Sequence, residues 1–336
     1  MMTNINPKPL LRVENLSVTL HTESMSIRPV RNVSYDVHAG RTVAIVGESG
    51  SGKTVMNMAP LGLLPAGVTS DLDGNVEFAG QNLLSLRESE MRSVRGGKIG
   101  VVFQDPLSAL NPARKIGYQI TEVIEHHKGL TAKSAEKLAI DLLGLVGIPD
   151  PASKFYQYPH ELSGGMRQRV VIASGISAEP SLLVADEPTT ALDVTVQAQI
   201  VCLLQDLQKR LGMAIVLVTH DIGVVSGMAD DLVVMYAGSV VEKGPAFDIL
   251  TAPKHPYTKA LLASVPRLNA AVGSPFRGLA GLPPDLSKKL NGCAFYERCE
   301  FAMPSCAYKR PLLQQVGPTR YAACPLAESA VLEVAE

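Results

Sequence analysis

The chain has 336 residues, a formal net charge of -1 at neutral pH, 46% hydrophobic residues and 19% charged residues. This balance is typical of a globular protein with a large apolar core, and the length suggests about two domains. The near-neutral charge provides no field that would favour nucleic acid or an acidic membrane surface, so we expect no nucleic-acid partner.

Membrane-spanning and secretory segments are not expected. No apolar run approaches the roughly 20 residues that a membrane-spanning helix needs. The start of the chain, "MMTNINPKPLLRVENLSV", lacks the basic region and apolar core of a signal peptide. We therefore expect the protein to stay in the cytosol, and any role at a membrane to depend on a partner.

Four short apolar runs predict buried strands. They are Val43–Val46, "IGVVFQDP" at Ile99–Pro106, "PSLLVADEPT" at Pro180–Thr189 and "MAIVLVTHD" at Met213–Asp221. Helical stretches separate them, which indicates an α/β fold with a mostly parallel sheet covered on both faces. Functional groups collect at the carboxyl ends of such strands. The residues at those ends are Gly47, Gln104, Asp186, Glu187 and His220.

The rest of the chain predicts a helical insertion and a separate tail. Helical periodicity in "ITEVIEHHKGL" and "SAEKLAIDLLGLVGI" indicates a helical subdomain at about 107–178. "DLVVMYAGSVVEKG" predicts a β-hairpin. Prolines and glycines over 266–292 indicate a linker, which a four-cysteine segment follows at 293–326.

"GESGSGKT" matches the pattern of a phosphate-binding loop between a strand and a helix. Polyphosphate needs several converging backbone N–H groups, which glycine permits, and a helix N-terminus adds a favourable dipole. We expect Lys53 to reach the β- and γ-phosphates and the Thr54 hydroxyl to ligate Mg²⁺. A small-residue turn is the alternative, which the flanking strand and helix disfavour. The expected nucleotide-binding residues are Gly47, Glu48, Ser49, Gly50, Ser51, Gly52, Lys53 and Thr54.

Asp186 and Glu187 follow the apolar run "LLVA". An aspartate in this position is typical of a Mg²⁺ partner beside a phosphate loop, and Glu187 is placed to orient or deprotonate the attacking water. A solvated acidic pair opening a turn is the alternative, which the strand and the phosphate loop disfavour. At two further strand ends, Gln104 could meet Mg²⁺ or the water, and His220 could contact the γ-phosphate.

A fifth motif, "LSGGMRQRV" at Leu162–Val170, decides the class. With "GESGSGKT", "VVFQDP", "LLVADEPTTALD" and "VTHD" in this order, the chain resembles the ATP-binding subunit of an ABC transporter over roughly 9–265. The resemblance implies an ABC-type P-loop ATPase fold. In that fold a mixed, mostly parallel core sheet accompanies an antiparallel β subdomain and an inserted helical subdomain. It also implies ATP hydrolysis coupled to solute translocation.

Subunits of this family dimerise head to tail, with each ATP between one phosphate loop and the opposite signature motif. The resemblance therefore implies contacts with the ATP of a second subunit. Asp193, in "ALD", would lie in a loop at the dimer interface, and Gln104 would begin the loop that contacts the membrane subunits. The signature residues that would bind ATP in trans are Ser163, Gly164, Gly165 and Gln168.

The adenine site departs from the family pattern. ABC ATPases usually place an aromatic residue near the start of the domain to stack on adenine. Leu20 and His21 occupy that region here. Stacking by His21 and apolar cover by Leu20 are both open, and so is the selectivity for the base.

Several stretches together resemble the oligopeptide/dipeptide importer branch: "FQDPLSALNP", "YPHELSGGMRQR", "HPYTKALLASVP" and the tail "GLPPDL…GCAFYERC…C". That branch implies two permease subunits, a second related ATPase in a heterodimer, an extracytoplasmic solute-binding protein, and a peripheral position on the cytoplasmic face of the inner membrane. Solutes of that branch range over peptides, nickel, opines and sugars, and we expect di- or oligopeptides here. The alternatives are an exporter ATPase and a soluble ABC ATPase acting on ribosomes or DNA. The soluble forms usually carry two ATPase domains or a long insertion, and neither is visible.

The tail contains Cys293-x5-Cys299-x6-Cys306-x17-Cys324. Four thiols are the number that an iron–sulfur cluster or a closed zinc site uses. From the residues alone a cluster, zinc and unliganded thiols all stay open, while a reducing cytosol disfavours disulfides. Some members of the peptide-importer branch bind a [4Fe–4S] cluster with such a tail, so the resemblance implies a structural cluster here. Cys202 is expected to be a small core residue.

Overall fold

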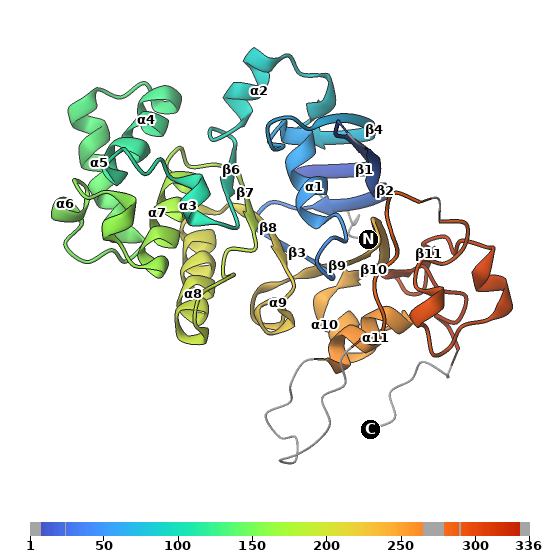
Figure 1. The fold of residues 1–336 in the computed structure, drawn as a ribbon. Coiled ribbons are helices and arrows are strands. Elements are labelled where there is room, and N and C mark those ends of the chain that lie inside the picture. The colour runs from blue at the N-terminus through green and yellow to red at the C-terminus, as the bar shows by residue number, and fades with distance from the viewer. Residues whose placement is uncertain (1–7, 24, 265–278, 289, 330–336) are drawn as a thin grey trace, which may run out of the picture. The chain divides into compact units, whose positions relative to one another are not determined.

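The computed structural model describes residues 8–23, 25–264, 279–288 and 290–329 (Figure 1). Two compact units, each discontinuous in sequence, make up the chain. Unit 1 consists of residues up to Leu10, Val37–Thr42 and Ser85–Val218, and unit 2 of Leu11–Asp36, Val43–Leu84 and Thr219 onward. Residues 266–278 of the expected linker lie outside the described residues.

Unit 1 contains a parallel sheet of central, apolar strands. β6 (Ile99–Val102), β7 (Leu182–Asp186) and β8 (Ala214–Thr219) lie side by side in that order. Every residue of β7 and β8 is buried, as expected of parallel strands covered on both faces. Polar groups that follow these strands are therefore delivered to one edge of the sheet.

Helix α8 (Val194–Leu211) follows β7 in the chain and buries one apolar stripe. Its buried residues are Ile200, Leu204 and Leu207, spaced as one helix face requires. Cys202 is exposed, so the prediction of a core position for it was wrong. Two residues from Ile200, it projects from a different face of the helix.

The segment between β6 and β7 is helical, and none of its residues at 107–178 belongs to a strand. Helices α4 and α5 pack against each other and against α7 (Figure 1). One residue per turn is buried in each helix: Ile116, Ile120 and Ile124 in α4, and Ala135, Ala139 and Leu143 in α5. The helices of unit 1 from residue 88 to 176 are α2 (Glu88–Val94), α3 (Pro106–Ala109), α4 (Ile116–Lys128), α5 (Ala132–Leu145), α6 (Pro151–Lys154) and α7 (Gly164–Ile176).

Unit 2 contains an antiparallel sheet in the order β2-β1-β4-β5. Strands β1 and β4 pair from Leu11↔Phe78 to His21↔Thr69, with an irregularity between Glu14 and Ser17. A short helix, α1 (Lys53–Met58), contacts β1. The strands are β1 (Leu11–His21), β2 (Ser26–Val37), β4 (Thr69–Phe78) and β5 (Gln81–Asn82).

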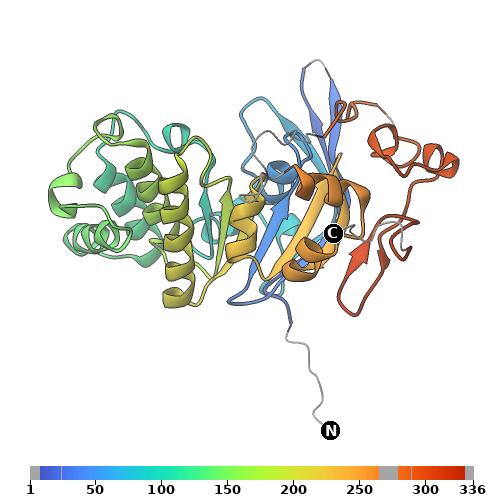
Figure 2. The ribbon, with the colours of Figure 1, turned by 90° about the horizontal axis from the view of Figure 1, so that it is seen from below.

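The second group of strands in unit 2 is mixed. β3 (Thr42–Val46) runs parallel to β9 (Asp231–Tyr236), and β9 forms the expected hairpin with β10 (Ser239–Pro245). β10 pairs in turn with β12 (Tyr321–Ala322), and β12 with β11 (Gln314–Gln315). α10 (Ala246–Thr251) contacts α9 (Ile222–Met228), and both α10 and α11 (Pro256–Ala263) lie against the hairpin (Figure 2).

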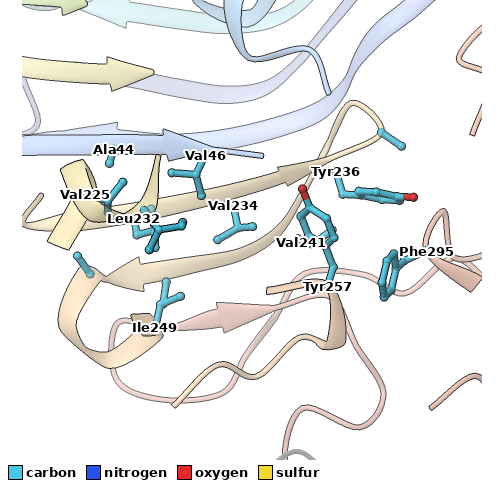
Figure 3. Close-up of a cluster of buried hydrophobic side chains, with 13 residues drawn as sticks. Ala44, Val46, Val225, Leu232, Val234, Tyr236, Val241, Ile249, Tyr257 and Phe295 are labelled. Atoms are coloured by element: carbon cyan, nitrogen blue, oxygen red, sulfur yellow. The ribbon is translucent and has the colours of Figure 1, made fainter. Parts of the chain in front are cut away.

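The four-cysteine segment, which is part of unit 2, packs against the strands of that unit through an aromatic cluster. Phe295 packs edge-on against Tyr236 and Tyr257, with ring centroids 5.3 and 5.5 Å apart (Figure 3). All three side chains are buried in the same core as Val46 and Val234. The short 3-10 turns Tyr296–Arg298 and Pro304–Ala307 follow. The segment therefore shares a hydrophobic core with β3, the strand that leads into "GESGSGKT".

Replacing Phe295 with alanine should lower the free energy of unfolding of unit 2 by about 3 kcal/mol, because a large buried ring is lost from a packed cluster. Phe247→Ala is the matched control, since Phe247 is 76% exposed in the same unit. Thermal and urea unfolding of both variants would measure the difference. Equal unfolding midpoints would contradict the proposed contribution of the aromatic cluster.

Candidate functional site

The phosphate loop, Gly47–Thr54, connects β3 to α1 and is packed too closely for side chains at two positions. A Cβ at Gly47 would lie 2.2 Å from the carbonyl oxygen of Met235. At Gly52, where φ is +96°, it would lie 2.0 Å from the carbonyl oxygen of Pro29. The loop is thus fixed on both flanks by backbone contacts that only glycine allows.

Lys53 is buried and turns back into the phosphate loop. Its Nζ donates to the carbonyl oxygens of Gly47, at 2.8 Å, and Glu48, at 3.1 Å. The ammonium group therefore lies inside the curve of the loop. Ser51 is buried, and its carbonyl oxygen accepts from the N–H of Gly238 at 3.0 Å, while Ser49, Gly50 and Thr54 are exposed. Exposed loop residues beside the buried Lys53 ammonium group are suited to binding an anion.

Two residues that the sequence analysis missed hold Glu48 in this loop. The Arg298 guanidinium makes a two-pronged ion pair with the Glu48 carboxylate, at 2.7 and 2.8 Å. The Glu48 N–H donates to the Tyr257 hydroxyl at 2.9 Å. Nothing in the sequence indicates which of the 31 lysines and arginines pairs with Glu48.

The two candidates for the adenine site lie at the end of β1, in unit 2. The His21 ring bonds Ser26 Oγ at 2.7 Å and Asp71 Oδ2 at 2.9 Å. Leu20 belongs to the buried core. His220, in the same unit, is exposed directly after β8. The neighbouring Asp221 caps α9 by accepting from the N–H of Gly223 at 2.7 Å.

In unit 1, the structure brings Gln104 and Glu187 together at the ends of neighbouring strands. Gln104 Nε2 donates to Glu187 Oε2 at 2.9 Å, and the Thr190 hydroxyl donates to the same oxygen at 2.9 Å. Glu187 has the left-handed φ of 45° and is 8% exposed, and Asp186 beside it is 3% exposed. A non-glycine residue in this conformation is uncommon and occurs often at functional sites. The Glu187 carboxylate is therefore held in one orientation.

The signature motif opens α7. Ser163 is the N-cap residue, and its hydroxyl accepts from the N–H of Met166 at 3.3 Å. Gly164 and Gly165 form the first turn, where backbone N–H groups are available to an anion. Gln168 is only 1% exposed, and its Nε2 has no hydrogen-bond partner among the described residues. With the side chain as it lies, Gln168 faces the interior of unit 1.

Asp193 begins the next helix of unit 1. It is exposed, and its carboxylate caps α8 by accepting from the N–H of Val196 at 2.9 Å. Val194, directly after it, is 82% exposed.

The four tail cysteines line one cavity in unit 2, together with His255 and Phe295. The Cys293 N–H donates to the carbonyl oxygen of Cys306 at 2.8 Å. Burial raises the pKa of Cys293 and Cys299, and raises that of Cys324 to about 11. Within the described ranges, no three thiol, imidazole or carboxylate groups converge closely enough to hold one metal ion.

The four thiols that line this cavity match in number the ligands of an iron–sulfur cluster or of a closed zinc site.

Solved structures with this architecture define the class. A post-hydrolysis dimer of the ATP-binding cassette MJ0796 bound to ADP and Pi matches with a TM-score of 0.62 and 28% identity, over 70% of this chain and 98% of that chain. CbiO1 of Clostridium perfringens, part of the ABC transporter complex cbiONQ, matches with a TM-score of 0.60 and 28% identity, over 72% and 90%. The protein is an ABC-type P-loop ATPase, which confirms the predicted fold class.

Curated relatives define the branch. The OppD oligopeptide transport ATP-binding protein of Bacillus subtilis is 46% identical over 93% of this chain and 87% of its own. The DppD dipeptide transport ATP-binding protein of Escherichia coli K12 is 46% identical over 94% and 96%. Family profiles match at residues 30–190 (ABC transporter) and 241–306 (oligopeptide/dipeptide transporter, C-terminal region). The chain belongs to the ATP-binding subunits of oligopeptide and dipeptide ABC transporters.

Among the described helices of this chain, none combines the length and apolar character needed to span a bilayer.

Gly52→Ala should abolish detectable ATP binding at concentrations that saturate the wild type, because its Cβ would collide with the Pro29 carbonyl oxygen. Gly212→Ala is the control. Its φ of +65° is also left-handed, but its Cβ meets no atom within 4 Å, so the change costs about 1 kcal/mol of backbone strain only. Isothermal titration with ATP would measure both. Wild-type affinity in Gly52→Ala would contradict the packing argument.

Proposed function

We propose that this protein is the ATPase subunit of an importer for di- and oligopeptides, and that it couples ATP binding and hydrolysis to peptide uptake. The observation that carries the proposal is the 46% identity, over more than nine-tenths of the chain, to oligopeptide and dipeptide transport ATPases. The match to the C-terminal region of oligopeptide/dipeptide transporters supports the same branch.

ATP binding is assigned to the phosphate loop, Gly47–Thr54. Its backbone N–H groups and Lys53 Nζ would hold the phosphates. Thr54, Gln104 and Asp186 are the groups that would hold Mg²⁺, which when bound neutralises charge on the β- and γ-phosphate oxygens. The burial of Lys53 beside exposed loop residues supports this assignment.

Hydrolysis is assigned to Glu187, with His220 at the γ-phosphate. The Glu187 carboxylate would accept the proton of the attacking water, or orient that water. Hydrogen bonds from Gln104 and Thr190 support this role because they fix the rotation of the carboxylate before water arrives. A catalytic base that is already oriented before the substrate binds lowers the entropic part of the activation barrier.

A second, related ATPase subunit is the proposed dimer partner. Ser163, Gly164 and Gly165 would contact ATP held by that subunit, using the N–H groups at the start of α7. Asp193, exposed at the start of α8, would lie at the interface with that subunit. Gln168 would join this contact only after turning out of the interior of unit 1.

Two permease subunits and an extracytoplasmic solute-binding protein are the other proposed partners, with the ATPase on the cytoplasmic face of the membrane. The loop after β6 is the proposed permease contact. Phe103 and Leu107, on either side of Gln104, are 37% and 55% exposed and offer an apolar surface there. A movement of Gln104 on ATP binding would then displace the surface that contacts the permease.

Glu187→Gln, introduced into the chromosomal gene, should abolish uptake of labelled di- and oligopeptides while free amino acid uptake continues. The purified variant should bind ATP but hydrolyse it at least ~100-fold more slowly, since a general base is lost. Glu179→Gln is the control, because Glu179 forms only an exposed ion pair with Lys128. Normal peptide uptake in the Glu187→Gln strain would refute the proposed function.

We also propose that Cys293, Cys299, Cys306 and Cys324 hold a [4Fe–4S] cluster with a structural role. The cluster would cross-link a segment that has few core residues of its own. The shared cavity of the four thiols supports the proposal. The raised thiol pKa values mean that protons must leave when such a group binds.

Anaerobically purified protein should contain about four irons and four acid-labile sulfides per chain. Cys306→Ser should lose most of this iron, because one ligand is removed from a buried position. Cys202→Ser should retain it, because Cys202 lies on an exposed face of α8. Wild-type protein that lacks both iron and sulfide would rule the cluster out.

A further inference from the structure

We propose that Arg298 is a positioning residue for ATP binding: it holds the phosphate loop in shape through Glu48, and so makes the cysteine segment (residues 293–326) a determinant of nucleotide affinity. The proposal rests on the assignment of ATP to the phosphate loop. The segment then contributes to ATP binding, in addition to binding any group at its four thiols.

Arg298 makes as many hydrogen bonds as a guanidinium can. Two of its N–H groups bond the Glu48 carboxylate, one on each oxygen. The other three donate to the Tyr236 hydroxyl at 3.1 Å, and to the carbonyl oxygens of Ala280 at 2.8 Å and Leu279 at 3.4 Å. A lysine offers three donors from one nitrogen and cannot reproduce this planar pattern.

The surroundings of Arg298 strengthen this ion pair. The side chain is only 5% exposed, so solvent and salt screen the pair weakly. Its guanidinium carbon lies 5.8 Å from the Tyr236 ring centroid and 5.9 Å from that of Phe295, within range of cation–π attraction. Two-pronged pairs of this kind fix orientation as well as distance. Arg298 therefore holds Glu48 in one place.

Glu48 is held at three points, all within unit 2. Arg298 binds its carboxylate, the Tyr257 hydroxyl accepts from its N–H, and Lys53 Nζ donates to its carbonyl oxygen. The following residues, Ser49 and Gly50, form the exposed part of the loop. Anchoring Glu48 thus restricts the loop before nucleotide arrives, and such preorganisation lowers the entropy lost on binding.

The cysteine segment sets the position of Arg298. Arg298 directly precedes Cys299 and lies three residues after Phe295, whose ring packs edge-on against Tyr236 and Tyr257 (Figure 3). The Cys293 N–H bonds the Cys306 carbonyl oxygen in the second 3-10 turn, and the Cys293 carbonyl oxygen accepts from the N–H of Tyr296 in the first. A change in the packing of the segment would therefore move Arg298, and through Glu48 the phosphate loop. Chemistry at the thiols would reach the nucleotide by this route.

The test measures ATP affinity by isothermal titration for anaerobically purified wild type and for Arg298→Gln, Arg298→Lys, Glu48→Gln and the Arg298→Gln/Glu48→Gln double variant. Each single variant should bind ATP about tenfold more weakly, within the usual range of coupling between sites. The double variant should be no weaker than the weaker single, because both changes break the same contact.

Arg310→Gln is the matched control. Arg310 belongs to the same segment but bonds Ser239 Oγ and the carbonyl oxygen of Arg31, with no contact to the phosphate loop, so its ATP affinity should stay within twofold of wild type. If Arg298→Gln fails to fold, Glu48→Gln breaks the pair from the loop side and leaves the segment unchanged. Wild-type affinity in Glu48→Gln, or additive losses in the double variant, would overturn the proposal. Failure of wild-type protein to bind ATP would instead refute the assignment of ATP to the loop.

Discussion

The phosphate loop is constrained on every side by unit 2. Gly47 and Gly52 contact backbone carbonyl groups, Lys53 bonds the loop from within, and the Arg298–Glu48 pair fixes it from the cysteine segment. These contacts come from parts of the chain that are far apart in sequence. A loop that binds polyphosphate through backbone N–H groups depends on such constraint, because those groups must converge before the ligand arrives.

Unit 1 contains a second group of proposed functional residues, which hydrogen bonds also hold in place. Gln104, Glu187 and Thr190 form one hydrogen-bonded set at the ends of β6 and β7, and Ser163 caps the signature helix. Glu187 and the Gln104 side chain that orients it thus follow neighbouring strands, as is usual at the carboxyl ends of parallel strands.

The sequence predicts the parallel strands well and the tail contacts poorly. β7 and β8 are buried on both faces and appear as continuous apolar runs, so their positions were predicted correctly. The antiparallel strands β1 and β2, with polar residues on one face, were not located. Cys202 was misplaced because a small residue carries little information on which helix face it occupies. The Arg298–Glu48 pair spans 250 residues, and no periodicity or motif spacing reports such a contact.

The central claim is that this chain energises peptide import from the cytoplasmic side of a membrane complex. The most direct test is to purify the tagged chain in mild detergent from its own host's membranes and to identify bound proteins by mass spectrometry. The account predicts two permeases and a second, related ATPase. Recovery with ribosomal or DNA-repair proteins, and without any membrane protein, would contradict it.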